Sequence, residues 1–103
     1  MKTYEINGIK YSLEKNYRDG FDQETTTERL TDYFYDYDYV LGDWAYGKLR
    51  LKGFYENGSK KAKPLNNIIN LEKYLKDNCA VNCRYFLLKK TKKKRIDYPS
   101  KSW

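Results

Sequence analysis

The sequence predicts a single small α+β domain, in which a mostly antiparallel sheet of about five strands packs with two helices. The chain has 103 residues, which is the length of one domain. Short segments of alternating apolar and polar residues are separated by short turns, and such turns join antiparallel strands. Two other segments carry apolar residues at helical spacing, so the expected order is β-β-α-β-β-α-β.

The N-terminal segment predicts a β-hairpin. Asn7-Gly8 is the strongest two-residue hairpin signal. After this turn, three apolar residues occupy alternate positions and would share one face of the second strand: Ile9, Tyr11 and Leu13. Residues 16–21 are expected to form a turn-rich loop.

Residues 22–36 predict the first helix, with Asp22 as its N-cap. Its apolar stripe follows the spacing i, i+3, i+4 and i+7: Leu30, Tyr33, Phe34 and Tyr37. Three consecutive threonines at 25–27 are poor helix formers, so the first turns are expected to be loose.

The second half of the chain predicts three strands and a helix. A strand at 37–41, a turn region at 42–47 and a strand at 48–56 come first. Pro64 suits the start of a second helix over 65–78. The nearly continuous apolar run at 85–88 is typical of a buried central strand.

The positive charge is concentrated at the C-terminus. The net charge is +7, and residues 84–103 contain eight basic side chains and one acid, whereas the rest of the chain is balanced. We therefore expect a domain over 1–90 and a basic, disordered tail over 91–103. Such a tail suits RNA, DNA or an anionic membrane surface, and it equally suits a solubilising terminus.

The sequence predicts a cytoplasmic protein that is not inserted in a membrane. The segment at residues 1–5 lacks the apolar region of a signal peptide, and no apolar run approaches the length of a membrane span. Cys79 and Cys83 are expected to be small buried residues in a reducing compartment, with a redox switch as the alternative. A disulfide between them is geometrically possible but is not expected in such a compartment. Two cysteines without histidine cannot complete a zinc site in one chain.

The segment 42–54 is the most distinctive in the chain. It combines glycines with three aromatic residues (Trp44, Tyr46 and Phe54) and three cations on alternate strand positions (Lys48, Arg50 and Lys52). Aromatic residues next to cations suit a flat and anionic partner. Structural interpretations stay open, because glycines also serve tight turns and the cations also suit a solvated strand face neutralised by the acidic helix.

The candidate binding residues form one set along the chain. They are Arg18, Asp43, Trp44, Tyr46, Lys48, Arg50, Lys52, Phe54, Lys92, Lys93, Lys94 and Arg95. Arg18 offers a planar fork for phosphate or carboxylate, although Asp19-Gly20 also suits a plain turn. Together the residues favour a module that binds RNA or a ribonucleoprotein. The alternative is a protein–protein interaction domain with no nucleic-acid role, which the tyrosine content favours.

Catalytic signatures are absent from the sequence, so no enzyme activity is expected. There is no histidine to act as a general base, and no phosphate-binding loop of the Walker or Rossmann type. Asp36, Asp38 and Asp43 could in principle bind a metal for hydrolysis, but neighbouring strand positions face opposite sides. No cofactor or metal is therefore expected, and nothing in the sequence indicates an oligomeric state.

Four segments together resemble the YutD-like family. They are Lys15–Phe21, Asp38–Trp44, Gly47–Phe54 and Cys83–Lys89, and the resemblance covers roughly residues 3–90. It implies a compact α+β domain in the cytoplasm of Gram-positive bacteria. The family has no assigned activity, so the resemblance brings no catalytic residues to this chain.

Overall fold

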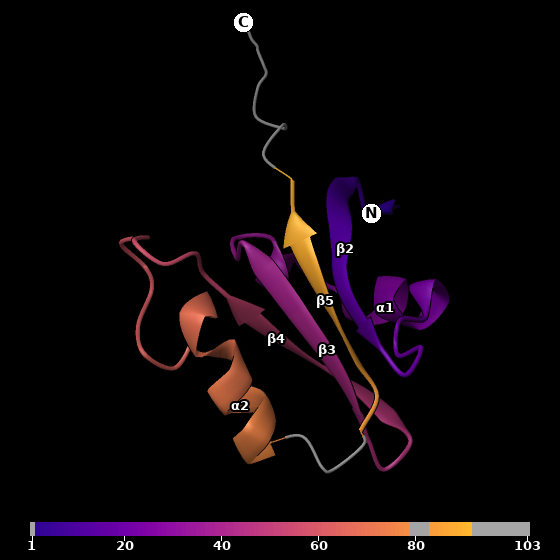
Figure 1. The fold of residues 1–103 in the computed structure, drawn as a ribbon. Coiled ribbons are helices and arrows are strands. Elements are labelled where there is room, and N and C mark those ends of the chain that lie inside the picture. Colours follow the sequence, from indigo (N-terminus) through magenta and orange to yellow (C-terminus); the bar gives the residue numbers. More distant parts are fainter. Residues whose placement is uncertain (1, 79–82, 92–103) are drawn as a thin grey trace, which may run out of the picture.

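The computed structural model describes residues 2–78 and 83–91 of the chain (Figure 1). The elements, with η for a 3-10 helix, follow in order: β1 (Thr3–Ile6), β2 (Ile9–Tyr17), α1 (Gln23–Arg29), η1 (Asp32–Phe34), β3 (Tyr39–Ala45), β4 (Lys48–Phe54), η2 (Ile68–Asn70), α2 (Leu71–Asn78) and β5 (Tyr85–Lys90). The predicted order of strands and α-helices is confirmed.

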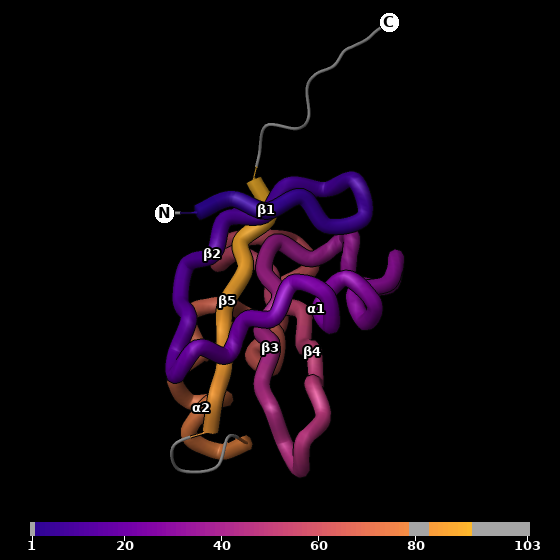
Figure 2. The backbone as a smooth tube through the Cα atoms, turned by 90° about the vertical axis from the view of Figure 1, so that its right-hand side faces the viewer, coloured from indigo at the N-terminus to yellow at the C-terminus, as the bar shows by residue number. Residues whose placement is uncertain are grey.

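All five strands form one sheet in the order β1-β2-β5-β3-β4, and every neighbouring pair is antiparallel. The sheet consists of two hairpins, β1–β2 and β3–β4, with β5 inserted between them (Figure 2). The prediction that β5 is a buried central strand is therefore confirmed. Three consecutive residues of β5 are buried because its side chains alternate between two covered faces: Phe86, Leu87 and Leu88.

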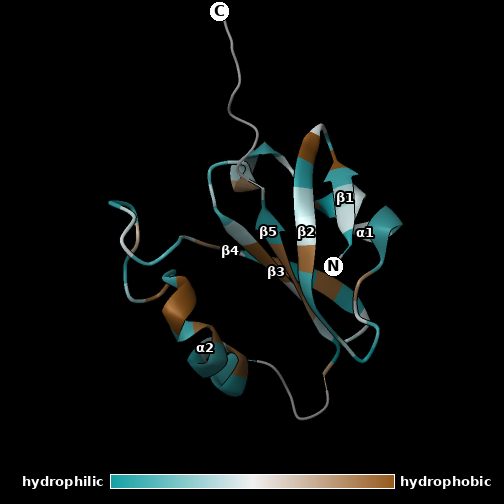
Figure 3. Ribbon diagram, turned by 45° about the horizontal axis from the view of Figure 1, so that its top comes forward, coloured by the Kyte–Doolittle hydropathy of each residue, from teal (hydrophilic) through white to brown (hydrophobic). Residues whose placement is uncertain are grey.

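The two faces of the sheet carry separate apolar clusters. On the face toward α1, the buried cluster is Ile6, Tyr11, Leu30, Val40, Leu49, Phe86 and Leu88. On the face toward α2, the buried cluster is Leu41, Phe54, Leu71, Leu75 and Leu87. Figure 3 shows the apolar colouring in the middle of the sheet and on part of α2. Each helix thus covers one face, which makes a three-layer α+β arrangement.

The first hairpin forms as the sequence predicts. Asn7 and Gly8 have φ values of 53° and 86°, which are the left-handed values that a type I′ turn needs. Farther along β2, the register with β5 shifts between Leu13 and Lys15. The strand is therefore bulged, and β2 reaches its end with Tyr17 opposite Tyr85.

The first helix is shorter than predicted, and its first turn is capped as the sequence predicts. Asp22 is the N-cap and accepts a hydrogen bond from the Thr25 backbone N–H at 3.2 Å, so the helix begins firmly. It ends at Arg29 because Leu30 turns into the core with ψ 91°. The Asn7 amide caps this end by donating to the Leu30 carbonyl at 2.7 Å. Residues 32–34 then form only a 3-10 turn.

The predicted turn at 42–47 was too long. Gly42 lies inside β3, and the turn consists of Tyr46 and Gly47, with φ values of 54° and 76°. Gly42 is needed for packing, because a Cβ there would lie 2.2 Å from Cζ of Phe86. The glycine therefore admits an aromatic ring against the strand.

The second helix begins later than predicted, because asparagine side chains hold residues 63–70 in a turn. Asn66 accepts a hydrogen bond from the Lys63 N–H at 2.6 Å, and Asn67 accepts one from the Ile69 N–H at 3.1 Å. Asn70 donates to the Pro64 carbonyl at 3.0 Å. Asparagine competes with helical hydrogen bonds in this way.

Strand β5 ends at Lys90, and the next residue is still bonded to β2. Thr91 donates from its backbone N–H and from its hydroxyl to the carbonyl of Lys10. The predicted tail residues from 92 onward, and Cys79, lie outside the described residues. Cys83 takes part in a disulfide bond, which corrects the expectation of reduced thiols. Within the described part of the chain, no helix has the length and apolar character to cross a membrane.

Candidate functional site

Several of the candidate residues that the sequence singled out lie at one end of the sheet. Here β2 leaves the sheet, β5 enters it, and the β3–β4 hairpin turns (Figure 1). We call this region the turn end, and it comprises Tyr17, Arg18, Asp43, Trp44, Tyr46, Arg50, Arg84 and Tyr85. The strand pairing places Tyr85 opposite both Tyr17 and Asp43, so three strands meet at this point.

Trp44 connects the loop after β2 to strand β3 by a hydrogen bond. Its indole nitrogen donates a hydrogen bond to the Gly20 carbonyl at 2.7 Å. The guanidinium of Arg84 lies over the indole ring, with its carbon 4.8 Å from the ring centroid, which is a cation–π distance. A guanidinium nitrogen of Arg84 also donates to the Asp19 carbonyl at 3.3 Å.

Tyr17 and Tyr85 form the second aromatic element of the turn end. Their rings stack with centroids 5.1 Å apart and planes 23° apart. Arg18 follows with its guanidinium carbon 6.0 Å from the Tyr17 centroid. Arg18 and Asp19 both have positive φ, 54° and 55°, which is uncommon for residues other than glycine. Gly20 lies so close to Tyr85 that a Cβ would be 2.7 Å from its backbone nitrogen.

Tyr46 occupies the tip of the β3–β4 hairpin. Its side chain is fully exposed, while its backbone is held in the left-handed region by the two-residue turn. An exposed ring on a rigid turn loses little conformational freedom when it binds.

Asp43 and Arg50 bind each other across β3 and β4. Two guanidinium nitrogens of Arg50 donate to the two carboxylate oxygens of Asp43, at 3.0 and 2.7 Å. The Asp43 side chain is 5% exposed and that of Arg50 is 49% exposed. The Asp43 hydrogen bond raises the pKa of Arg50 above its usual value. Arg50 also donates to the Asn78 carbonyl at the end of α2, at 3.1 Å, so this pair joins sheet and helix.

Two predicted residues lie farther along β4 and not at the turn end. The Lys52 ammonium is 5.2 Å from the Phe54 ring and 5.6 Å from the Tyr74 ring of α2. Phe54 itself is buried beneath α2. Cations do alternate with apolar residues along β4, as the sequence predicts. They lie on the face of the sheet that α2 covers. Lys48 is exposed beside the hairpin, and the four tail cations at 92–95 lie outside the described residues.

Three residues of the turn end were missed by the sequence analysis: Tyr17, Arg84 and Tyr85. They come from the ends of β2 and β5, which are far apart in sequence and pair only in the folded sheet. Their sequence signal is the pair Arg84-Tyr85, in which a cation and an aromatic ring directly precede the apolar residues 86–88 of β5.

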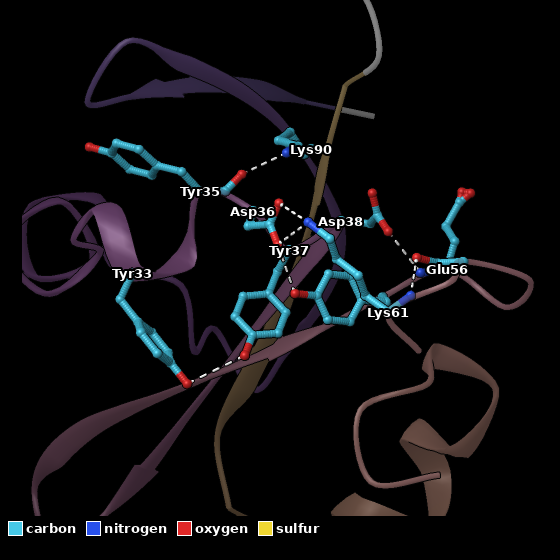
Figure 4. Close-up of polar contacts among 10 residues, drawn as sticks. Tyr33, Tyr35, Asp36, Tyr37, Asp38, Glu56, Lys61 and Lys90 are labelled. Atoms are coloured by element: carbon cyan, nitrogen blue, oxygen red, sulfur yellow. Dashed lines mark hydrogen bonds and ion pairs between the residues drawn. The ribbon is translucent and has the colours of Figure 1, made fainter. Parts of the chain in front are cut away.

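A second polar cluster surrounds Asp36 (Figure 4). The Lys61 ammonium lies 2.7 Å from both carboxylate oxygens of Asp36, and the Tyr55 hydroxyl donates to the same carboxylate at 2.9 Å. These hydrogen bonds lower the pKa of Asp36. The pKa of Tyr55 rises to about 12, mainly through burial and also through its bond to Asp36.

The three aspartates that the sequence offered as metal ligands are engaged separately. Asp43 binds Arg50, Asp36 binds Lys61, and Asp38 accepts a hydrogen bond from the Glu56 backbone N–H at 2.9 Å. Among the described residues, no group of three or more acidic, histidine or cysteine side chains could hold a metal ion. The cluster around Asp36 instead ties the loop after β4 to the segment before β3.

Comparison with known proteins decides the family. A family model described as "Putative antitoxin YutD-like" matches residues 5–89. The chain belongs to the YutD-like family. It is 40% identical over 88 residues to a Bacillus subtilis (strain 168) protein named "Putative antitoxin YutD", and the match covers 85% of this chain and 97% of that protein.

A solved structure shares the fold. The solution NMR structure of protein yutD from B. subtilis matches with a TM-score of 0.76 and 35% identity, and it covers 97% of this chain and 92% of that chain. The YutD-like assignment and the α+β fold are thus confirmed.

Proposed function

We propose that this YutD-like chain is a non-enzymatic binding module that captures a protein partner at the turn end of its sheet. The family description names an antitoxin, and we take the partner to be a toxin protein that the module counteracts. The observation that carries the proposal is the exposed Tyr46 ring on the two-residue β3–β4 turn, at the same end of the sheet as Trp44, Arg50 and Arg84. Tyrosine, tryptophan and arginine supply most of the binding energy at protein interfaces.

Two cations of β4 already have partners within the domain, which favours a protein partner over RNA. Arg50 is bound by Asp43, and Lys52 is held over two rings beside α2, so neither is a free phosphate ligand. The described residues therefore present no continuous basic track along β4, which single-stranded nucleic acid would follow.

The test is affinity capture from a nuclease-treated lysate of the organism that encodes the chain. We expect one protein to be captured by the wild type and by Tyr33→Ala, and to be lost with Tyr46→Ala. Tyr33 is a matched control, because it is also an exposed tyrosine but lies in η1, beyond the opposite end of β3. Removal of residues 92–103 should leave capture intact. Capture that Tyr46→Ala does not reduce, confirmed with the purified partner, would overturn the proposal.

RNA binding is the second candidate. The stacked Tyr17 and Tyr85 rings and the Trp44 indole favour it, since rings next to arginine can stack on bases. Amide NMR titration with a decauridine oligonucleotide tests it at two salt concentrations. Neutralising about five phosphates predicts a slope of log K against log salt of about −3.5 for a single strand. Shifts confined to the residues after Lys90, or none, would leave only the protein partner.

A further inference from the structure

The layer that covers the α1 face of the sheet is strongly acidic. Residues 19–38, which include α1 and η1, have seven acidic side chains and one cation, Arg29, so their formal charge is −6. The other described residues contain fifteen cations and six acids. Figure 3 shows α1 in the hydrophilic colour. One face of the sheet thus carries an acidic layer within a basic domain.

The carboxylates on the outer face of α1 are unpaired within the described part of the chain. Glu24 and Glu28 are exposed and lie one helical turn apart, and none of the ion pairs among the described residues includes either of them. Like charges four residues apart destabilise a helix, so a bound cation would relieve this repulsion. Farther along the same layer, Asp36 already binds Lys61 at 2.7 Å.

Strand β5 ends on the same side of the sheet. Lys90 is paired with Tyr11, which belongs to the buried cluster on the α1 side, so the Lys90 side chain lies on that face. Its ammonium donates to the Tyr35 carbonyl at 2.6 Å, within the acidic layer (Figure 4). The layer therefore binds lysines from two other parts of the chain.

The last turn of α1 lies near the point where the described chain ends. The Thr91 N–H donates to the Lys10 carbonyl at 3.0 Å. Lys10 follows the β1–β2 turn, in which the Asn7 side-chain amide donates to the Thr27 carbonyl at 3.3 Å. Three residues of a strand span about 10 Å, so the hairpin brings Thr91 and Glu28 into the same region.

The basic tail begins directly after Thr91. Residues 92–103 contain five cations and one acid, and four of the cations are consecutive at 92–95. Four extended residues span about 13 Å, which is more than two turns of an α-helix. Because the tail and α1 belong to one chain, their effective concentration is about millimolar. Ion pairs too weak to hold two separate molecules together are then sufficient.

We propose that the outer face of α1 binds the chain's own basic tail, with the α1 carboxylates as partners of the cations at 92–95. The charges are complementary, and the tail continues from a lysine that is already bound to the acidic layer. A tail bound in this way is withheld from RNA and from anionic membranes, which must displace it. The proposal goes beyond the capture of a protein partner, because Tyr46 lies at the other end of β3.

The test is an NMR salt titration of the full-length wild-type protein, followed through the amide signals of α1 and of residues 92–95. Between low salt and about 1 M, where the Debye length is about 3 Å, both sets of signals should follow one common transition. Neutralising the tail should move the α1 signals to their high-salt positions even at low salt. This variant combines Lys92→Gln, Lys93→Gln, Lys94→Gln and Arg95→Gln.

The reciprocal variant and two controls locate the contact. Glu28→Gln should lower the equilibrium constant for docking about threefold, the middle of the range for an exposed ion pair. Glu72→Gln removes an exposed acid from the first turn of α2 and should leave that constant unchanged. Neutralising four exposed lysines elsewhere should leave the α1 signals at their low-salt positions. This control combines Lys48→Gln, Lys60→Gln, Lys63→Gln and Lys76→Gln.

Three outcomes would overturn the proposal. The first is that the α1 signals do not respond when the tail is neutralised. The second is an equal effect of Glu72→Gln, which would mean general charge attraction. The third is a dependence of the signals on protein concentration, which would assign the α1 face to the tail of a second copy. The wild-type titration does not depend on any variant folding, and none of these outcomes alters the test of capture with Tyr46→Ala.

Discussion

The ring of Phe86 occupies the space in which a side chain on Gly42 would begin. A Cβ at Gly42 would lie 2.2 to 2.9 Å from three atoms of the ring, and Phe86 is completely buried. This contact joins β3 to the central strand, and it explains why a glycine stands inside a strand that is otherwise apolar on this face.

Gly42→Ala is therefore expected to destabilise the domain by about 1–3 kcal/mol, the range for overpacking a filled core. Urea denaturation followed by circular dichroism measures the change. Phe86→Leu in the same chain is the control, because the smaller side chain leaves room for the methyl group. The double variant should lose less stability than the two single variants added together. Simple additivity would show that the ring and the glycine do not interact.

Tyr11→Phe is expected to stabilise the protein. The Tyr11 ring is buried in the core, and its hydroxyl has no hydrogen-bond partner among the described residues. Removing a buried, unsatisfied hydroxyl while keeping the ring should increase the free energy of unfolding by about 1 kcal/mol. Tyr55→Phe is the matched comparison and should decrease it by about 1 kcal/mol, since the Tyr55 hydroxyl donates to Asp36. A loss of stability in both variants would contradict the assignment of Tyr11.

Asp43 and Arg50 are expected to be energetically coupled. A double-mutant cycle with Asp43→Asn and Arg50→Gln should give a coupling energy of about 1 kcal/mol, because the Arg50 side chain is half exposed and solvent weakens the ion pair. Asp43→Asn alone should also loosen the contact between Arg50 and the end of α2. Thermal unfolding of the four proteins measures the coupling energy. A value near zero would show that the ion pair does not stabilise the folded protein.

Acid should weaken the attachment of the loop after β4. The pKa of Asp36 is lowered in the folded state by hydrogen bonds from Lys61 and Tyr55. A depressed carboxyl pKa contributes stability above the unfolded value of about 3.9, and this contribution disappears as the pH falls through the folded pKa. Stability should thus fall less steeply below pH of about 4 in Asp36→Asn than in the wild type.

The control for the acid dependence is Asp32→Asn. The Asp32 side chain makes no hydrogen bond or ion pair with the described residues, so this variant should keep the steep fall of the wild type. Urea midpoints measured across the acid range distinguish the two. Parallel curves for Asp36→Asn and the wild type would rule out a role for the Lys61 contact in acid stability.

The order of the elements could be predicted because turn sequences and apolar spacing are local properties. Asn7-Gly8 determines its own turn, and Asp22 caps its own helix. Helix lengths were less predictable, since Leu30 leaves the helix to reach the core and Asn67 holds back the start of α2. Both effects depend on neighbours that a single periodic pattern does not contain.

The candidate site could be predicted only in part, for the same reason. The sequence singled out Arg18, Trp44 and Tyr46, because rings, cations and glycines are conspicuous in the chain. It did not indicate that Asp43 would neutralise Arg50, nor that Arg84 would stack on Trp44. Those relationships follow from strand order and register, which place β5 between two hairpins.

The position of β5 also determines when the proposed binding surface is complete during synthesis. During synthesis the two hairpins and both helices leave the ribosome before β5, and each hairpin can form from its own local contacts. The arrival of β5 completes the sheet between them, through pairings with β2 that span most of the domain. Contacts of long sequence separation form slowly. A nascent or truncated chain without β5 would therefore hold Tyr46 and Arg18 on an incomplete sheet, and we expect partner capture to begin only when β5 has paired with β2 and β3.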